Sequence, residues 1–453
     1  MANVIPESLI VNIWQHQLLG RTDLTTEEGE PIKVIYPGRI NDDQGADLRD
    51  AIIATGQRLI KGDVEIHVKS SSWWSHRHHQ DPMYNRVILH VVFWHDNKAV
   101  TNLQNGGKVP TLVLHKYVKS PTYQQTDPTL HQTNLSIPCH QGIGHSNTDS
   151  TSKFLDSAGE QRFLDKATKF QADLAQTEAR QSLYQGIMGA LGYAKNKLPF
   201  LELARRLPLQ VLESITRGIA SDEECLAQQQ ALLLGTAGLL PSQRSHGYQS
   251  NKDDGGIDKF EKLWDSSHQT ESMSENDWRL FKVRPNNFPT RRMVGISYLT
   301  LRYREKGILE EAVNKLRETP VYAGHHELEK LLMVSTDGYW TSHLDLGSAT
   351  KLRIPTLIGS GRAADILVNV LLPFALAWVK LNSQPELARK VLDFYHHYPR
   401  LVANTIEKHM RNQLGIGSNL VNSAQRQQGL IHIYQTLCSQ GKCHCCPLHS
   451  GTL

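Results

Sequence analysis

The segment from residue 63 to residue 69 places ionisable side chains at every second position. Apolar residues fill the alternate positions, which is typical of a strand with one buried face. The ionisable set is Asp63, Glu65, His67 and Lys69. Another acid, Asp47, opens the apolar segment 47–54, and a hairpin joining the two segments brings Asp47 beside Glu65. Hard divalent cations prefer carboxylate oxygens, so this pair is a candidate for metal chemistry on a phosphate substrate.

Histidine is frequent, with 22 residues in a chain of 453, and several follow the predicted hairpin directly. The segment 73–81 supplies His76, His78 and His79, and His90 comes later. Imidazole is a common ligand of zinc and other transition metals, so one interpretation is a metal site. In another, His76 and His79 contact a phosphate beside the acidic pair. In a third, the histidines are surface residues and the neighbouring tryptophans pack on the domain.

Three cysteines near the C-terminal end have the spacing Cys438-x4-Cys443-x2-Cys446 and are followed by proline. Thiolates at this spacing bind Zn²⁺ tetrahedrally or hold an iron–sulfur cluster, commonly 4Fe–4S. Clustered cysteines of this kind indicate a metal or cluster site in a reducing compartment better than they indicate a set of disulfides. Candidates for a fourth ligand are Cys445, His444, His449 and the distant Cys139. The alternative is a tail with reactive thiols.

A basic segment at 282–292 contains four cations, two prolines and Phe288. An extended basic segment can follow a phosphate backbone, and Phe288 can stack on a base. This interpretation makes Arg284, Arg291 and Arg292 substrate-binding residues. In the other interpretation, which we slightly prefer, the segment is a structural loop whose arginines cap neighbouring helices.

The elements that must position these residues change character near residue 150. Expected before it are a helix at 7–18 and strands at 32–36, 47–54, 63–70, 84–94 and 111–114. After a polar linker at 142–152 the apolar spacing becomes helical. Helices are expected at 307–317, 325–333, 361–381, 385–398, 401–413 and 422–438. The predicted fold class is α+β, with a mixed α/β domain at 1–140, a large all-α domain at 153–437 and a Cys-rich tail at 438–453.

Composition bounds the class of protein. A chain with 39% hydrophobic and 21% charged residues is typical of a soluble globular protein, here of two or three domains. The net charge of +4 is too balanced to indicate a nucleic-acid partner by itself. The most apolar run, 366–379, is interrupted by Asn369 and Pro373 and is too short for a bilayer. The first residues lack a basic and apolar signal segment. We therefore expect a cytoplasmic protein without a membrane partner.

The layout of a helix, an acid opening one strand, and an acid two residues before a base on the next strand resembles the PD-(D/E)XK nuclease superfamily. The resemblance implies that Asp47 and Glu65 bind Mg²⁺ or Mn²⁺. His67 stands where the superfamily usually has lysine, and Lys69 on the same face can share its role of positioning or activating water. Gln80-x3-Tyr84 matches an element of the exonuclease branch that contacts DNA.

The cysteines resemble those of RecB-type nucleases, in which one early and three late cysteines hold a 4Fe–4S cluster. By that resemblance Cys139 joins the three late cysteines.

Motifs spread along the chain are together similar to a bacterial family, the domain of unknown function twenty-eight fifty-one. They are the segments 62–68, 73–84, 87–92, 191–193 and 284–292 and the cysteine spacing. This resemblance implies no activity. From the residues, the sequence predicts a metal-dependent nuclease acting on DNA or RNA. A non-catalytic nucleic-acid-binding scaffold and a zinc hydrolase centred on the histidines are the alternatives.

Overall fold

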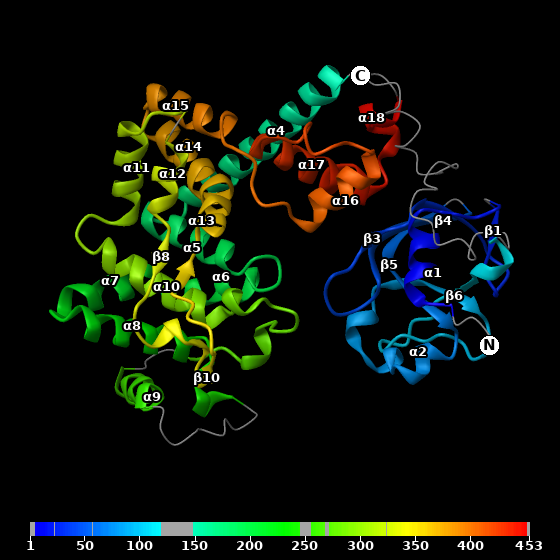
Figure 1. The fold of residues 1–453 in the computed structure, drawn as a ribbon, viewed down its shortest axis with the longest axis horizontal. Coiled ribbons are helices and arrows are strands. Elements are labelled where there is room, and N and C mark those ends of the chain that lie inside the picture. The colour runs from blue at the N-terminus through cyan, green and yellow to red at the C-terminus, as the bar shows by residue number, and fades with distance from the viewer. Residues whose placement is uncertain are drawn as a thin grey trace. The chain divides into compact units, whose positions relative to one another are not determined.

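The computed structural model describes residues 5–21, 23–56, 58–118, 148–244, 255–267, 271–322 and 324–450. The chain divides into two compact units (Figure 1). The sheet unit comprises Met1–Ala158, Ala403–Leu420 and Gly429–Leu453, and the helical unit comprises Gly159–Val402 and Val421–Gln428. The coarse prediction of an N-terminal mixed region followed by a large helical region is confirmed.

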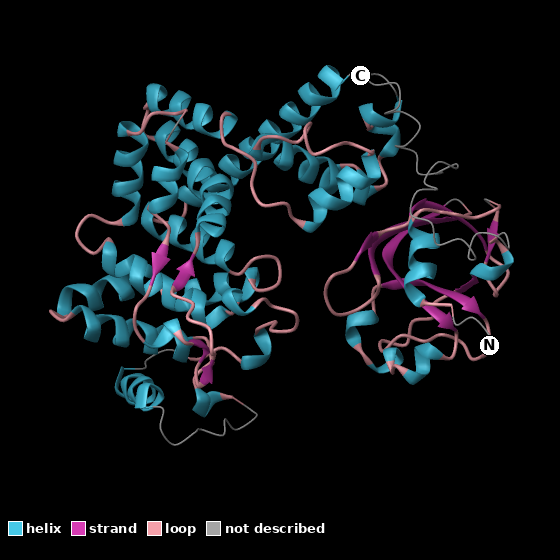
Figure 2. Ribbon diagram, viewed as in Figure 1, coloured by secondary structure: helices cyan, strands magenta, loops and turns pink. Residues whose placement is uncertain are grey.

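The sheet unit is built on a mixed, strongly curved ribbon of strands, shown as magenta arrows in Figure 2. The strands are β1 (Leu24–Thr25), β2 (Pro31–Tyr36), β3 (Arg39–Ile40), β4 (Leu48–Thr55), β5 (Arg58–Lys69), β6 (Val87–Trp94) and β7 (Thr111–Val113). Their order is β1-β2-β4-β5-β6-β7, with β3 also paired to β4. Pairing is antiparallel as far as β5 and parallel from β5 to β6 and from β6 to β7. The predicted hairpin is therefore present as β4 and β5.

The histidine-rich segment is the connection between the parallel strands β5 and β6. Parallel neighbours need a crossover because the chain must return to the same end of the sheet. Here the crossover contains the short helix α2 (Ser72–Ser75) and 3₁₀ turns at His78–Gln80 and Pro82–Tyr84. In the parallel register Glu65 lies opposite His90. The crossover and β6 thus return the histidines to the strand that carries Glu65.

Helix α1 (Glu7–Gln15) covers one face of the sheet. Its Ile10, Ile13 and Trp14 belong to the same buried cluster as Val64 and Ile66 of β5. Because side chains alternate along a strand, the intervening polar residues of β5 point to the opposite face. That face is also closed, by a smaller cluster of Ala46, Trp73, Val87, Leu103 and Val109. Asp63, Glu65 and His67 of β5 are consequently buried, although they are ionisable.

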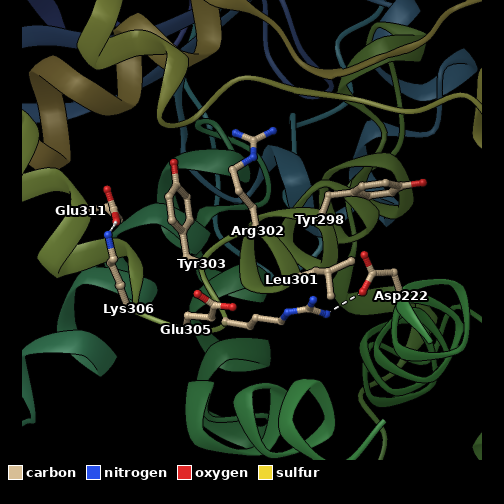
Figure 3. Close-up of a pocket in the computed structure, with 9 residues that line it drawn as sticks. Asp222, Tyr298, Leu301, Arg302, Tyr303, Glu305, Lys306 and Glu311 are labelled. Atoms are coloured by element: carbon tan, nitrogen blue, oxygen red, sulfur yellow. Dashed lines mark hydrogen bonds and ion pairs between the residues drawn. The ribbon is translucent and has the colours of Figure 1, made fainter. Parts of the chain in front are cut away.

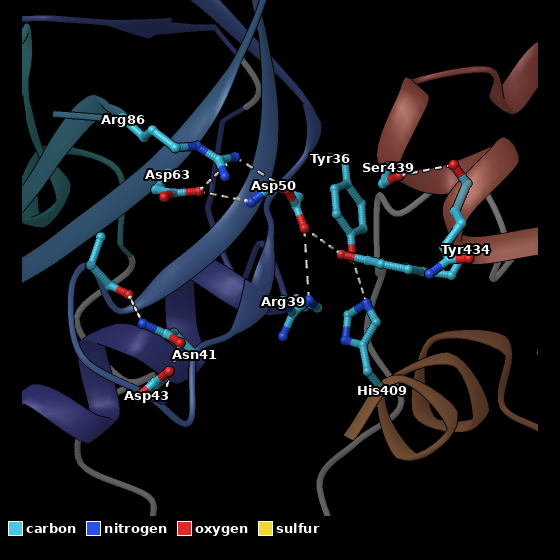
Figure 4. Close-up of polar contacts among 12 residues, drawn as sticks. Tyr36, Arg39, Asn41, Asp43, Asp50, Asp63, Arg86, His409, Tyr434 and Ser439 are labelled. Atoms are coloured by element: carbon cyan, nitrogen blue, oxygen red, sulfur yellow. Dashed lines mark hydrogen bonds and ion pairs between the residues drawn. The ribbon is translucent and has the colours of Figure 1, made fainter. Parts of the chain in front are cut away.

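The C-terminal part of the chain belongs to the sheet unit. It contains α16 (Thr405–Leu414), most of α17 (Ala424–Thr436) and α18 (Pro447–Ser450). Tyr434 Oη donates to Asp50 Oδ2 at 3.0 Å, and Tyr36 Oη shares a hydrogen bond with His409 Nε2 (Figure 4). The compact units therefore do not follow the boundaries 1–140, 153–437 and 438–453 that the sequence suggested, because contacts distant in sequence join the two ends of the chain.

The helical unit is assembled from helices and two small antiparallel strand pairs. The helices are α4 (Thr148–Leu174), which begins in the sheet unit, α5 (Ala179–Leu191), α6 (Lys197–Arg206), α7 (Leu209–Gly218), α8 (Asp222–Thr236), α9 (Gly255–Ser267), α10 (Pro289–Arg302), α11 (Ile308–Glu318), α12 (His325–Lys330), α13 (Ser360–Ile366), α14 (Leu372–Leu381) and α15 (Pro385–His396). The strand pairs are β8 (Val334–Ser335) with β11 (Thr356–Ile358), and β9 (His343–Asp345) with β10 (Ser348–Ala349). Their apolar side chains form one extended core.

The most apolar segment of the helical unit runs continuously through α13 and α14. A π-helical turn at Leu367–Leu371 joins them just before Pro373, which lacks a backbone N–H. Among the described residues, Ser360–Leu381 is the segment long and apolar enough to cross a membrane. Its most apolar stretch is 72% buried within the structure, which is the situation of a core helix.

Candidate metal centre

Two carboxylates meet where β4 and β5 run side by side. The Asp47 N–H donates to Glu65 Oε2 at 3.0 Å, and the Ile66 N–H donates to Asp47 Oδ2 at 3.0 Å. Each acid therefore receives a backbone hydrogen bond from the other acid's segment, which fixes the two carboxylates relative to each other. Glu65 is only 5% exposed. The structure thus brings together the two acids that the sequence predicts to lie together.

Two histidines lie against Glu65, and a third lies against one of them. Glu65 Oε1 lies 3.4 Å from His67 Nε2 and 3.2 Å from His78 Nε2. His67 Nε2 in turn lies 3.2 Å from His76 Nδ1. One ligand atom from each histidine lies within 4.8 Å of the others. The three imidazole nitrogens are therefore close enough to hold one metal ion, and a Glu65 oxygen lies beside two of these rings.

The local backbone explains how two histidines of one loop reach the same carboxylate. Arg77, between His76 and His78, has φ +61°, in the left-handed region that a non-glycine residue adopts only under strain. This residue separates the end of α2 from the following 3₁₀ turn. Strain of this kind persists where surrounding structure enforces it, and here it accompanies the convergence of the two rings.

Neighbouring groups hold the histidine rings in place. His67 Nδ1 shares a 2.9 Å hydrogen bond with His90 Nε2, and His90 Nδ1 lies 3.4 Å from Thr101 Oγ1. The His78 ring stacks on Tyr84 with 3.8 Å between ring centroids. An imidazole whose second nitrogen or ring face is held in this way keeps a fixed orientation. Such support is typical of rings that act as ligands.

Burial shifts the pKa values of the two acids upward. It raises the pKa of Asp47 to about 6, and the charge of Glu7 on α1 adds to this shift. Burial also raises the pKa of Glu65 to about 9, with a further contribution from the Asp47 charge. Both shifts come mainly from removing the carboxyl groups from solvent, and at Glu65 the Asp47 charge adds to this effect.

The histidine pKa values shift the other way. Burial, followed by the charge on His90, lowers the pKa of His67 to about 2. Burial also lowers the pKa of His78 to about 4 and that of His90 to about 3. These imidazoles are therefore neutral at physiological pH, the protonation state in which histidine binds metals.

Two other residues predicted for this site lie at its margin. Lys69 is exposed at the end of β5. The His79 ring lies against Trp74, with 4.4 Å between ring centroids, and is not one of the three convergent histidines. His78 and His90 lie inside the cluster instead. The sequence showed that many histidines were available but gave no signal for choosing among them.

The basic segment in the helical unit separates into residues with different environments. Arg284 is exposed, whereas Arg291 is fully buried. The Arg291 guanidinium donates to four backbone carbonyls, those of Trp340, His343, Ile354 and Thr356. Arg292 donates to Leu357 O, Tyr193 Oη and Asn287 Oδ1. Arg291 and Arg292 therefore brace loops of the helical unit and are not placed to receive a substrate, as the structural-loop interpretation expects.

The cysteine segment packs on the sheet. Its turn at Cys438–Gln440 contacts β4, and Gly441, at φ +67°, has no room for a side chain without crowding Ile52. Cys438 and Cys446 are buried, and Cys443 is half-buried. Among the described residues, the ligand atoms of the three histidines lie close enough together to hold one metal ion, and the cysteine thiols do not form such a group.

Two candidates for completing the cysteine site, Cys139 and the side chain of His449, lie outside what the structure describes. A zinc or 4Fe–4S site at the cysteines stays a prediction.

A hollow of about 550 Å³ opens on the helical unit (Figure 3). Its wall includes Tyr298, Arg302 and Tyr303. Its charged rim is already paired, since Arg304 bonds Asp222 at 2.5 Å and a lysine and a glutamate pair at 3.3 Å. Mixed and mutually neutralised charges indicate no particular ligand class.

Comparison with protein families gives one match. The family model described as protein of unknown function (DUF2851) matches residues 7–401. No curated protein and no solved structure matches the chain. The family match covers both the acid–histidine cluster and most of the helical unit, but it assigns no chemistry to either.

Proposed function

We propose that this chain, which belongs to the DUF2851 family of proteins of unknown function, is a divalent-metal-dependent hydrolase that cleaves phosphodiester bonds of DNA or RNA. The observation that carries the proposal is the contact of Asp47 and Glu65 on neighbouring strands, with neutral histidines around them. A cation between such groups relieves the cost of burying the carboxylates and takes the lone pairs of the carboxylate and imidazole atoms that face it.

A cation held by these residues would polarise a phosphoryl oxygen and activate a water for attack near neutral pH. The residues of the chain would supply the general base. The Asp47 carboxylate would act in this role. Its hydrogen bond from Ile66 fixes one oxygen and leaves the other to accept a proton from the attacking water.

The arrangement of elements also supports the proposal. A helix precedes the sheet, Asp47 lies directly before β4, and Glu65 and His67 share one face of β5. This is the layout whose resemblance to PD-(D/E)XK nucleases suggested nucleic acid as the substrate. Glu7 on the preceding helix acts on the charge state of both acids, which places a third carboxylate near the pair.

The test is cleavage of labelled single- and double-stranded DNA and RNA in the presence of Mg²⁺, Mn²⁺ or Zn²⁺. Cleavage is expected from the unmodified protein and is lost in Glu65→Gln, in Asp47→Asn and with a chelator. Glu30→Gln, an exposed acid in the same unit, is the matched control and keeps activity. If no substrate is cleaved under any condition, the proposal fails, and binding without cleavage then favours the scaffold alternative.

A further inference from the structure

We infer that the cation of this centre is a tetrahedrally coordinated transition metal of the zinc type, bound by Glu65, His67, His76 and His78, and not Mg²⁺. The inference deepens the proposed function by naming the metal class and the ligands at the same site. The evidence for it is geometric. The first experiment that tests it measures metal content, which does not depend on catalysis.

Three of the separations between potential ligand atoms match the edge of a tetrahedron around zinc. They are 3.2 Å for His67 Nε2 to His76 Nδ1, 3.4 Å for His67 Nε2 to Glu65 Oε1, and 3.2 Å for His78 Nε2 to Glu65 Oε1. Four ligands at zinc distances place neighbouring ligand atoms about 3.3–3.4 Å apart. Octahedral ligands at magnesium distances are about 2.9–3.0 Å apart. These three separations therefore suit the tetrahedral ion, and the ligand atoms of His67, His76 and His78 all lie within 4.8 Å of one another.

One buried atom lacks the partner that a metal supplies. His78 Nε2 is shielded from solvent and makes no hydrogen bond of acceptable geometry, although Glu65 Oε1 is 3.2 Å away. An unsatisfied buried polar nitrogen costs about 1–3 kcal/mol. A cation between His78 and Glu65 removes that cost, because both atoms then donate a lone pair to the same centre.

The donor set also favours a transition metal. Three imidazoles and one carboxylate suit zinc and its first-row neighbours, whereas Mg²⁺ prefers oxygen ligands and retains several waters. The atoms that do not face the metal are held by other groups. Glu65 Oε2 accepts from the Asp47 N–H, His67 Nδ1 bonds His90, and the His78 ring stacks on Tyr84. Outer contacts of this kind orient ligands in metal sites.

The four ligands differ in exposure, which assigns them different tasks. Glu65, His67 and His78 are buried, whereas His76 is exposed at the end of α2. Catalytic zinc sites keep three protein ligands and one exchangeable position. His76 is therefore the ligand that gives way to water or substrate. Asp47 is not a ligand in this arrangement: its N–H holds Glu65, and its carboxylate keeps the role of general base.

The experiment measures bound metal after the purified full-length protein is stripped with a chelator and reloaded with Zn²⁺ or Co²⁺. One equivalent of metal is expected at this site, and Co²⁺ should show the intense visible absorption of tetrahedral coordination. Glu65→Gln and His78→Ala should each lose that equivalent. Affinity should fall by more than the roughly 10- to 100-fold typical of losing an outer partner.

Matched variants separate the inference from its alternatives. His79→Ala removes the adjacent histidine and should keep the metal, and Asp47→Asn should also keep it while losing cleavage. Any metal held by the cysteines is counted separately, because it is lost in Cys443→Ser and retained in His78→Ala. Circular dichroism confirms that each variant is folded.

Two results overturn the inference. One is a protein that takes up no Zn²⁺ or Co²⁺ beyond the equivalent lost in Cys443→Ser. The other is uptake that Glu65→Gln and His78→Ala leave unchanged. Cleavage that proceeds with Mg²⁺ in a protein without this zinc site would leave the proposed function standing and remove the inference. Metal binding as described, without cleavage of any substrate, would do the reverse.

Discussion

The two units each bury strongly polar side chains, but they do so in opposite ways. In the helical unit, Arg291 is completely enclosed and its guanidinium donates to four backbone carbonyls. In the sheet unit, Glu65 is almost as deeply buried, yet its side-chain neighbours are another carboxylate and two imidazoles, His67 and His78. The first arrangement is complete without any further component, whereas the second contains groups that suit one another poorly until a cation is added.

This difference shows how a structural residue and a site residue can be told apart when both are buried and charged. Fixed backbone dipoles stabilise a charge permanently and leave it no capacity for a ligand. Titratable groups that face one another keep their lone pairs available, and their pKa values move far from the ordinary range. The comparison assigns chemistry to the sheet unit and support to the interior arginines of the helical unit.

The largest expected effect is on catalysis in the sheet unit. Glu65→Gln should lower the cleavage rate on the order of 10³-fold or more, because the lost metal contributes several kcal/mol to the transition state. The same variant should unfold at an equal or higher urea concentration when metal is absent, since glutamine removes the cost of burying an acid whose pKa is raised to about 9. A variant that loses activity only because it is unfolded would break the comparison.

The next effect is on stability in the helical unit. Arg291→Met should lower the free energy of unfolding by about 3–5 kcal/mol, because several buried carbonyls lose their donor at about 1–3 kcal/mol each. Arg284→Met, at an exposed position of the same segment, should change it by less than about 0.5 kcal/mol. Urea unfolding measures both. Equal stability of the two variants would contradict the structural role of Arg291.

A pH effect of intermediate size is expected where α16 meets the sheet. Burial, and then the charge of Arg39, lowers the pKa of His409 to about 4 (Figure 4). The folded protein therefore binds fewer protons at His409 than the unfolded chain, whose histidine pKa is near 6.5. The stability that neutral His409 provides is complete above pH 6.5 and is lost as the pH falls toward 4, by about 2–3 kcal/mol.

The measurement for this effect is the difference in unfolding free energy between the unmodified protein and His409→Gln from pH 7 to pH 4. The unmodified protein should lose more stability over this range, because glutamine does not titrate. Parallel pH profiles would show that His409 is not the titrating group. Taking the difference removes the contribution of the other buried histidines.

The smallest effect is expected from Arg284, the exposed arginine of the basic segment. If the helical unit contacts nucleic acid there, Arg284→Ala should weaken binding less than about tenfold and reduce the salt dependence of log K by about 0.7–0.9, the value of one phosphate contact. Fluorescence anisotropy at several salt concentrations measures both quantities. An unchanged salt dependence would leave the whole segment with a structural role.

The sequence predicts the site residues of β5 well, but it does not predict which histidines of the crossover join them. Alternation along 63–69 is a local signal, and it correctly places Glu65 and His67 on one face of β5. The turn that joins β4 to β5 is shorter than the gap between the predicted strands 47–54 and 63–70, because β5 begins at Arg58. Which histidines converge depends on the left-handed residue Arg77 and on the parallel pairing of β5 with β6. Neither follows from local composition.

The compact units differ from the predicted domain boundaries for a related reason. Helix periodicity correctly predicts that residues 401–413 and 422–438 are largely helical, but periodicity carries no information about the partner against which a helix packs. The contacts of His409 and Tyr434 join residues more than 370 positions apart in sequence. Such pairings depend on the whole fold, and single-sequence patterns do not encode them.

The most direct test of the central claim is cleavage of a labelled oligonucleotide by metal-free protein as metal is added back, for the unmodified protein beside Glu65→Gln. The account predicts that activity appears as one equivalent of metal fills the centre, and that Glu65→Gln neither binds that equivalent nor cleaves. Activity that is independent of added metal, or that survives in Glu65→Gln, would contradict it.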